Sequence, residues 1–215
     1  MDLSLEIARK VAPFLRTNGF ARSGKHFCKI SNDLAFCISL EMPSGIMYAT
    51  AYVVPLYVPC ECRYYTYGNR LSQIAGINLP ILSKTDDEAK IDEWYKLFCV
   101  SMEQRIIPFF EGINSPLKMV NYLHKTQPSF TSYIFCPSVD IYRLEMFTYF
   151  WVGEYDKVRN IVKLYCKDLK KMPFADSVIQ ARMEEVGIIE CMLKCEEKAK
   201  EYLMNTVSNT LKVLK

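Results

Sequence analysis

The sequence predicts an α+β fold: an antiparallel β-meander covered by helices on one face, followed by an α-helical C-terminal segment. Two kinds of pattern support this class, an apolar alternation between Asp33 and Pro59 and helical apolar stripes on either side of it. The strands are joined by short turns that leave no room for crossover helices, which favours antiparallel pairing. We expect residues 1–125 to form the α+β domain and residues 126–215 to form a helical segment packed on it, without necessarily folding independently.

The stretch Asp33–Pro59 is predicted to be a long β-hairpin. Its first arm alternates between two sets of side chains, so we expect one buried face of large residues, with small or polar residues opposite: Leu34, Phe36, Ile38, Leu40 and Met42 against Ala35, Cys37, Ser39 and Glu41. Pro43 and Gly45 indicate the turn. The second arm is expected to place Ile46, Tyr48, Tyr52, Val54, Leu56 and Val58 on one face, with Ala49 and Ala51 on the other.

Helical patterns flank this hairpin. Leu3–Thr17 has apolar residues at helical spacing and ends at Asn18-Gly19, two residues that tolerate the left-handed conformation. A polar link, Ala21–Lys25, leads to a strand at His26–Ile30. A second helix is expected over Asp86–Phe110, and a third from Ser115-Pro116 to about His124, since serine caps helices and proline suits their first turn.

The C-terminal part is predicted to be helical. Helices at Val139–Val152 and Glu154–Lys171, joined at Gly153, should form an antiparallel pair. Ala175–Leu214 should contain two helices, divided near Gly187 or in the polar interval Asn205–Asn209. Between Thr126 and Ser138 we expect a break that includes a candidate strand at Tyr133–Cys136.

Composition narrows the class of protein. Half of the 215 residues are hydrophobic, enough for a sizeable core, and the formal net charge is only +3. The start of the chain lacks the pattern of a secretory signal, and no apolar run approaches the ~18 residues of a membrane span. Nine cysteines at scattered spacing are typical of reduced thiols. We therefore expect a soluble cytoplasmic protein that does not bind a membrane.

Candidate catalytic and metal-ligating residues are few. We interpret His26 and His124 as structural, His124 because a histidine at a helix C-terminus interacts favourably with the helix dipole. The pair Cys60/Cys62 and the i, i+4 pair Cys191/Cys195 lie far apart in sequence and have no neighbouring histidine, unlike zinc sites. Arg22-Ser-Gly-Lys25 lacks the nucleotide-loop pattern. We predict no catalytic residue, no metal and no cofactor.

Nucleic acid is a weaker hypothesis. The first thirty residues contain an excess of basic side chains, namely Arg9, Lys10, Arg16, Arg22, Lys25 and Lys29 against Asp2 and Glu6. Tyr48, Tyr52 and Tyr57 lie on a neighbouring strand, so a basic and aromatic sheet face could bind single strands. The low net charge argues against it, and we do not expect nucleic acid to be the partner.

The most suggestive segment for binding is the loop Cys60–Tyr67 and the residues after it. It combines tyrosine and arginine, the residue types enriched in interface hot spots: Arg63, Tyr64, Tyr65, Tyr67 and Arg70. The loop either folds over the sheet as a lid or forms an exposed contact surface. We therefore expect a non-catalytic protein-binding module of unknown partner. One alternative is a hydrolase or transferase with a cleft between sheet and helices, and another is a weak nucleic-acid binder through the basic N-terminal region.

A set of short motifs also resembles a known family. The motifs are Gly19-Phe20, the basic link Arg22–Lys25, the apolar hairpin, Asn69–Leu71, Asp92–Trp94, Pro108–Phe110 and Ser115. Over roughly residues 5–165 the chain resembles the bacterial domain-of-unknown-function family 4304, although Cys60–Tyr67 departs from its pattern. The resemblance implies an α+β domain with no established enzymatic role and assigns no functional residues.

Overall fold

The computed structural model describes residues 2–60, 67–126 and 138–214, and the chain divides into two compact units. The described residues of the first unit are 2–54, 67–126 and 214, and those of the second are 55–60 and 138–213. The first unit contains an antiparallel sheet with helices, and the second is helical, so the predicted α+β class is confirmed.

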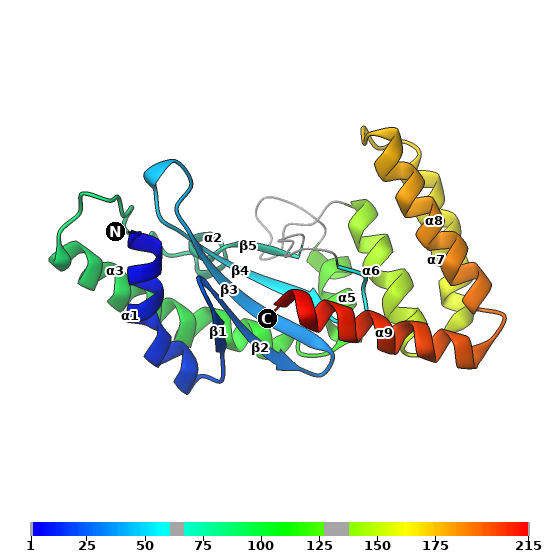
Figure 1. Ribbon diagram of the computed structural model, residues 1–215, viewed down its shortest axis with the longest axis horizontal. Helices are drawn as coiled ribbons and strands as arrows, with labels where there is room; N and C mark the ends of the chain where they lie inside the picture. Colours follow the sequence, from blue (N-terminus) through cyan, green and yellow to red (C-terminus); the bar gives the residue numbers. More distant parts are fainter. Residues whose placement is uncertain (1, 61–66, 127–137, 215) are drawn as a thin grey trace. The chain divides into compact units, whose positions relative to one another are not determined.

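Within the described residues the sheet has five strands, in the order β1-β2-β3-β4-β5 (Figure 1). They are β1 (Ala21–Ser23), β2 (His26–Ser31), β3 (Leu34–Glu41), β4 (Tyr48–Pro55) and β5 (Gly68–Arg70). A turn at Pro43–Gly45 links β3 to β4. The sequence predicted only three of these strands, because β1 and β5 have three residues each and such short strands show no alternation.

A two-residue turn fixes how β2 lies against β3. Asn32 and Asp33 both have positive φ, 49° and 67°, as the tightest hairpin turns require. The register pairs Ser31 with Leu34 and Lys29 with Phe36. Directly paired residues share a face of the sheet, so Lys29, Ser31 and Phe36 lie together on one face.

Burial corrects the predicted faces of the hairpin. Leu34 to Leu40 are all buried, including the small residues Ala35, Cys37 and Ser39, so the expectation of a single buried face for this strand is wrong. Small, weakly polar side chains can be buried as readily as large ones, and alternation alone does not separate the two cases. In β4, Ala49 and Ala51 are buried, whereas Tyr48 and Thr50 are only half-buried.

The first helix, α1 (Leu3–Thr17), matches its predicted range. The Asp2 carboxylate caps its start by accepting a hydrogen bond from the Ser4 amide. At its end, the amides of Gly19 and Phe20 donate to the carbonyls of Arg16 and Leu15, and Gly19 has φ +85°. This is the Schellman arrangement, which turns the chain sharply and returns Phe20 to the core.

The predicted helix over Asp86–Phe110 is one continuous helical run with an irregular centre. It consists of α3 (Glu88–Ser101), a π-helical segment (Met102–Ile106) and α4 (Ile107–Gly112). Pro108 lacks an N–H group and its ring crowds the preceding turn, so the wider π turn accommodates it. Phe98, Met102, Ile106 and Phe110 recur every four residues and are all buried. The π turn keeps this stripe on one face.

Two further helices complete the first unit. A short helix, α2 (Leu71–Ala75), follows β5 directly. The helix predicted from Ser115-Pro116 is α5 (Pro116–Thr126), and the Ser115 hydroxyl and carbonyl accept hydrogen bonds from its first turn.

The second unit contains α6 (Ser138–Trp151), α7 (Tyr155–Leu169), α8 (Asp176–Met192) and α9 (Glu196–Leu214) (Figure 1). The antiparallel pair joined at Gly153 is confirmed, with Gly153 at φ +80°. The predicted division of the last two helices is wrong, because the break lies at residues 193–195. Gly187 and Asn205–Asn209 are inside helices, where a single glycine costs only about 1 kcal/mol.

The segment that follows β4 belongs to the second unit. The Tyr57 ring is fully buried and stacks on Trp151, with 5.6 Å between ring centroids. Its hydroxyl lies 2.9 Å from the Thr148 hydroxyl, and Thr210 donates to the Val58 carbonyl. The predicted second arm to Pro59 is therefore too long, since the strand ends at Pro55 and Leu56–Val58 pack with helices.

Among the described residues, no helix combines the length and apolar character needed to cross a membrane. The candidate strand at Tyr133–Cys136 lies outside the described residues.

Gly68 offers a test of the β4–β5 packing. A Cβ atom at this position would lie 2.4 Å from Tyr52 Cβ and 2.6 Å from the Ala51 carbonyl oxygen. We expect Gly68→Ala to lower the free energy of unfolding by about 1–3 kcal/mol, measured by urea denaturation. The matched control is Gly112→Ala, whose Cβ would meet nothing within 4 Å. Equal stability of the two variants would contradict the proposed close packing.

The capping carboxylate of α1 is expected to make the stability of the protein depend on pH. Hydrogen bonds from Lys25 and Ser4 hold the pKa of Asp2 at about 2, below its ordinary value of 3.8. When folding lowers the pKa of a carboxyl group, the group stabilises the folded protein at pH values above its ordinary pKa. This stabilisation is lost as the pH falls through the lower pKa of the folded state.

Asp2→Asn keeps a capping side chain but removes the charge. We therefore expect this variant to be less stable than the wild type at pH 6, with the difference shrinking between pH 4 and pH 2. Urea titrations across this range measure the gap, and a gap that does not change with pH would show that the charge is not involved.

Candidate functional site

Two hollows lie on the surface of the first unit, one near each edge of the sheet. The first, about 210 Å³, is lined by residues of β3, β4, β5 and the turn after β3: Glu41, Pro43, Tyr48, Thr50, Gly68, Asn69 and Arg70. The second, about 230 Å³, is lined mainly by aromatic residues and is described below as the Phe pocket.

Arg70 is the central residue of the first hollow. The β4–β5 register pairs it with Thr50, and Tyr48 is the diagonal neighbour on the same face. The centre of the Arg70 guanidinium lies 3.4 Å from the centroid of the Tyr48 ring, a close cation–π contact. The backbone amide of Arg70 donates to Asn69 Oδ1 at 2.8 Å, which fixes the strand end. We call Arg70 and Tyr48 the Arg–Tyr stack.

The Arg–Tyr stack leaves hydrogen-bonding capacity unused. Arg70 is exposed, and it forms no ion pair with any residue in the described ranges. A guanidinium held over an aromatic ring keeps N–H groups that can donate to a carboxylate. Glu41 lines the same hollow and accepts a hydrogen bond from Ser39, so the hollow offers both a cation and an acceptor.

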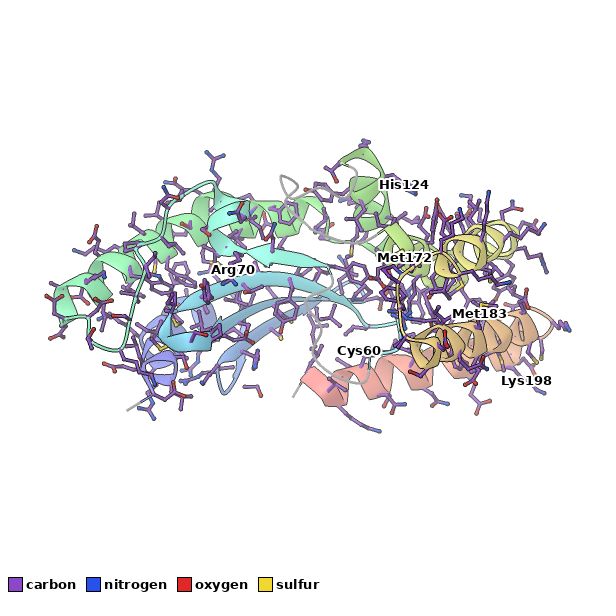
Figure 2. The ribbon with its side chains drawn as sticks, turned by 90° about the horizontal axis from the view of Figure 1, so that it is seen from above. Cys60, Arg70, His124, Met172, Met183 and Lys198 are labelled. Carbon is purple, nitrogen blue, oxygen red and sulfur yellow. The ribbon has the colours of Figure 1, made fainter. Side chains whose placement is uncertain are left out.

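Two of the five predicted binding residues, Arg70 and Tyr67, lie among the described residues. Arg70 lies at the surface, beside the strands of the sheet in Figure 2, whereas Tyr67 is buried with an exposed fraction of 5%. Tyr67 therefore has little exposed surface of its own: it directly precedes β5, and its carbonyl accepts a hydrogen bond from the Val53 amide. Arg63, Tyr64 and Tyr65 lie outside the described residues.

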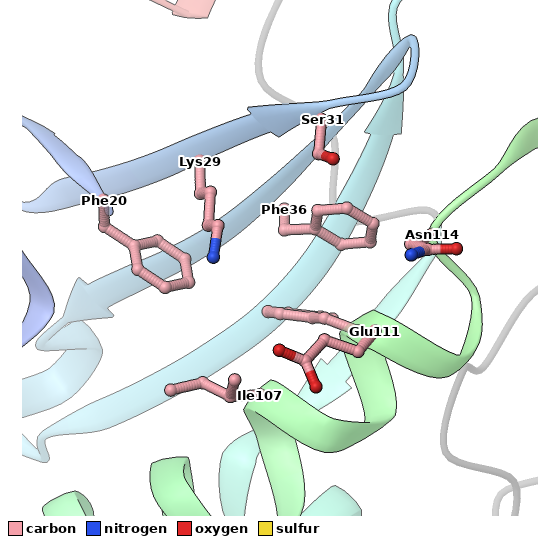
Figure 3. Close-up of a pocket in the computed structure, with 8 residues that line it drawn as sticks. Phe20, Lys29, Ser31, Phe36, Ile107, Glu111 and Asn114 are labelled. Carbon is pink, nitrogen blue, oxygen red and sulfur yellow. The ribbon is translucent and has the colours of Figure 1, made fainter. Parts of the chain in front are cut away.

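The Phe pocket lies between β2–β3 and α4 (Figure 3). Its apolar wall consists of Phe20, Phe36, Phe110 and Ile107. The centroids of the Phe36 and Phe110 rings are 4.8 Å apart. Phe20 comes from the turn after α1, Phe36 from β3 and Phe110 from α4. These three side chains are at most 5% exposed, so they line the pocket as part of the core.

Four polar side chains line the rest of the Phe pocket: Lys29, Ser31, Glu111 and Asn114. Figure 3 shows the Lys29 ammonium and the Glu111 carboxylate reaching into it from the sheet and from α4 respectively. The Asn114 amide oxygen accepts from Lys118 at 3.0 Å, and the Asn114 carbonyl accepts from Asn32 at 3.0 Å. These bonds hold the loop after α4 against the β2–β3 turn.

The two histidines lie in different elements, and His26 has cysteines near it in the sheet, since the β2–β3 register pairs Cys28 with Cys37. His26 lies in β2 opposite Ser39, and His124 is exposed in the last turn of α5. Cys191 is exposed in the last turn of α8, whereas Cys195 lies beyond the end of that helix, so the i, i+4 pair does not share one helical face. Within residues 2–60, 67–126 and 138–214, no three His, Cys, Asp or Glu side chains are placed to hold a metal ion.

The second unit has its own charged cluster, which is structural. Arg143 donates to both carboxylate oxygens of Glu185, at 2.7 and 2.5 Å, and also to the Pro59 carbonyl at 3.0 Å. Arg182 donates to Asp140 at 3.2 Å and to the Tyr165 hydroxyl at 3.4 Å. Burial raises the pKa of Tyr165, so its hydroxyl stays protonated. These bonds satisfy buried charges and tie the Pro55–Cys60 segment to the helices.

The aromatic face required for single-stranded nucleic acid is not available. Tyr52 and Tyr57 are both fully buried, so neither can stack on a base. Two of the basic N-terminal residues are paired within the first unit, Lys10 with Asp92 and Lys25 with Asp2.

Comparisons of the chain with protein-family models, with curated proteins and with solved structures found no match. The resemblance to the domain-of-unknown-function family therefore stays a prediction.

Sequence reasoning identified Arg70 but missed the Phe pocket. Phe36 was expected on the buried face of its strand. Phe20, Phe36 and Phe110 are all buried, yet one part of each lines the pocket. The residue that could have indicated the pocket is Lys29, because the β2–β3 register places this charged side chain on the same face of the sheet as Phe36.

Thiol reactivity can be tested directly. Burial raises the pKa of Cys99 and of Cys166, which lowers the fraction of reactive thiolate near neutral pH. Cys37 is fully buried and Cys191 is exposed.

We expect iodoacetamide at pH 7.5 to modify Cys191 at least tenfold faster than Cys37, Cys99 or Cys166 in the folded protein, measured by peptide mass spectrometry. Urea-unfolded protein provides the control, in which the rates should become similar. Rapid alkylation of Cys99 or Cys166 in the folded protein would indicate an activated thiol and favour the enzyme alternative.

Proposed function

We propose that this protein is a non-catalytic protein-binding module whose contact surface centres on the Arg–Tyr stack. The observation that supports the proposal most strongly is the exposed Arg70 guanidinium, held 3.4 Å from the Tyr48 ring centroid and left without an ion pair among the described residues. Arginine and tyrosine are the residue types enriched in interface hot spots. An arginine already ordered on a ring loses less conformational entropy when it binds.

The chemistry of the hollow indicates the kind of partner. Arg70 can donate two parallel hydrogen bonds to a carboxylate, and Glu41 can accept a hydrogen bond from the same partner. A hollow of about 210 Å³ is smaller than the ~300–1,000 Å³ typical of drug-sized ligands. Its size and charges therefore suit a protein surface that presents one carboxylate to Arg70 and a hydrogen-bond donor to Glu41.

The test uses three forms of the full chain, immobilised for capture from a lysate of the native host. They are the wild type, Arg70→Gln and the matched control Arg105→Gln, which removes an exposed arginine from the π-helical segment. We expect a protein that binds the wild type and Arg105→Gln equally but Arg70→Gln at least tenfold more weakly.

Purified partner should reproduce this difference by isothermal titration, and binding should weaken as salt concentration rises. Arg70→Lys, which keeps the charge but loses the flat stack, should bind with intermediate affinity. The proposal is wrong if every captured protein is retained equally by Arg70→Gln, or if no protein binds the wild type; unchanged circular dichroism confirms that the variants are folded.

A further inference from the structure

We infer that the Phe pocket is a binding site for a free α-amino acid with an apolar side chain. This site is separate from the Arg–Tyr stack and does not depend on the function proposed above. It is built from four elements of the first unit: the turn after α1, the β2–β3 hairpin, α4 and the loop that follows α4.

The apolar wall favours a hydrophobic ligand of limited size. Three phenylalanine rings and Ile107 line a volume of about 230 Å³, which is below the usual range of sites for drug-sized molecules. A pocket lined by buried aromatic side chains favours an aromatic or branched aliphatic group. The volume accommodates a ligand about as large as one amino acid.

Two opposite charges that line the Phe pocket favour a zwitterionic ligand. Lys29 reaches the pocket from β2 and Glu111 from α4, and within the described part of the chain neither forms an ion pair with the other or with a third residue. An anionic ligand without a positive group would be repelled by Glu111, and a cationic ligand without a negative group would be repelled by Lys29. An α-amino acid presents its carboxylate to Lys29 and its ammonium group to Glu111 while its side chain contacts the rings.

The polar groups around the pocket are held in place before binding. The backbone at Gly19 is left-handed, and a Cβ there would lie 3.4 Å from Lys29 Cε, so the absent side chain lets the lysine methylenes lie close beside this turn. The Asn114 oxygen is engaged by Lys118, and Figure 3 shows the amide nitrogen on the pocket side. Asn114 and the Ser31 hydroxyl can therefore supply further hydrogen bonds to a carboxylate.

The probe is L-phenylalanine, compared with two fragments that each lack one charge. These are 3-phenylpropionate, which lacks the ammonium group, and phenethylamine, which lacks the carboxylate. We expect L-phenylalanine to bind the wild type at least tenfold more tightly than either fragment, measured by isothermal titration. In ¹H–¹⁵N spectra, L-phenylalanine should shift the amide signals of Ser31, Phe36 and Asn114.

Two substitutions separate the roles of the charges. Lys29→Gln should abolish the preference for L-phenylalanine over phenethylamine, and Glu111→Gln should abolish the preference over 3-phenylpropionate. The matched control Glu103→Gln removes an exposed carboxylate from the neighbouring π-helical segment and should keep both preferences. Because each comparison is made within one variant, a small loss of stability does not obscure the result.

The inference is overturned if either fragment binds the wild type as tightly as L-phenylalanine. It is also overturned if 10 mM L-phenylalanine and 10 mM L-leucine leave the amide signals of the pocket residues unchanged. Neither result bears on Arg70, so failure here leaves the protein-binding proposal to its own test.

Discussion

The register of the sheet is the constraint on which both candidate sites depend. A shift of one residue between paired strands would move every side chain of that strand to the opposite face. At one edge, the left-handed turn Asn32-Asp33 sets β2 against β3 and places Lys29 on the face of Phe36. At the other, Gly68 packs against Tyr52 where no Cβ fits, which places Arg70 opposite Thr50 and beside Tyr48.

The parts of the fold that could be predicted are those whose causes lie within one segment. Leu3–Thr17 shows its helix because the apolar period, the cap at Asp2 and the stop at Gly19 are all local. The sequence of β5 shows no such local pattern, because this strand depends on the close packing of Gly68 against Tyr52 in β4. The break at residues 193–195 was missed for a different reason. Gly187 suggested the end of a helix, but a helix tolerates one glycine whose surroundings are open.

The candidate sites show the same limit. Arg70 could be identified because its residue type suggests recognition, but its companion Tyr48 lies in another strand and could be found only from the register. Phe36 was correctly expected to be buried, and Phe20 and Phe110 are buried as well. These residues also line the Phe pocket beside Lys29 and Glu111, which come from different elements, and no sequence period indicates that these side chains lie together.

The two candidate sites lie on different faces of the sheet. Phe36 and Glu41 are both in β3 and one has an even and the other an odd position, so their side chains lie on opposite faces of the sheet. The Phe pocket therefore opens on one face and the Arg–Tyr hollow on the other. A partner seated on Arg70 leaves the Phe pocket accessible, and any influence of one ligand on the other has to pass through the packed strands between them. Such coupling requires that each ligand favour a different arrangement of those strands.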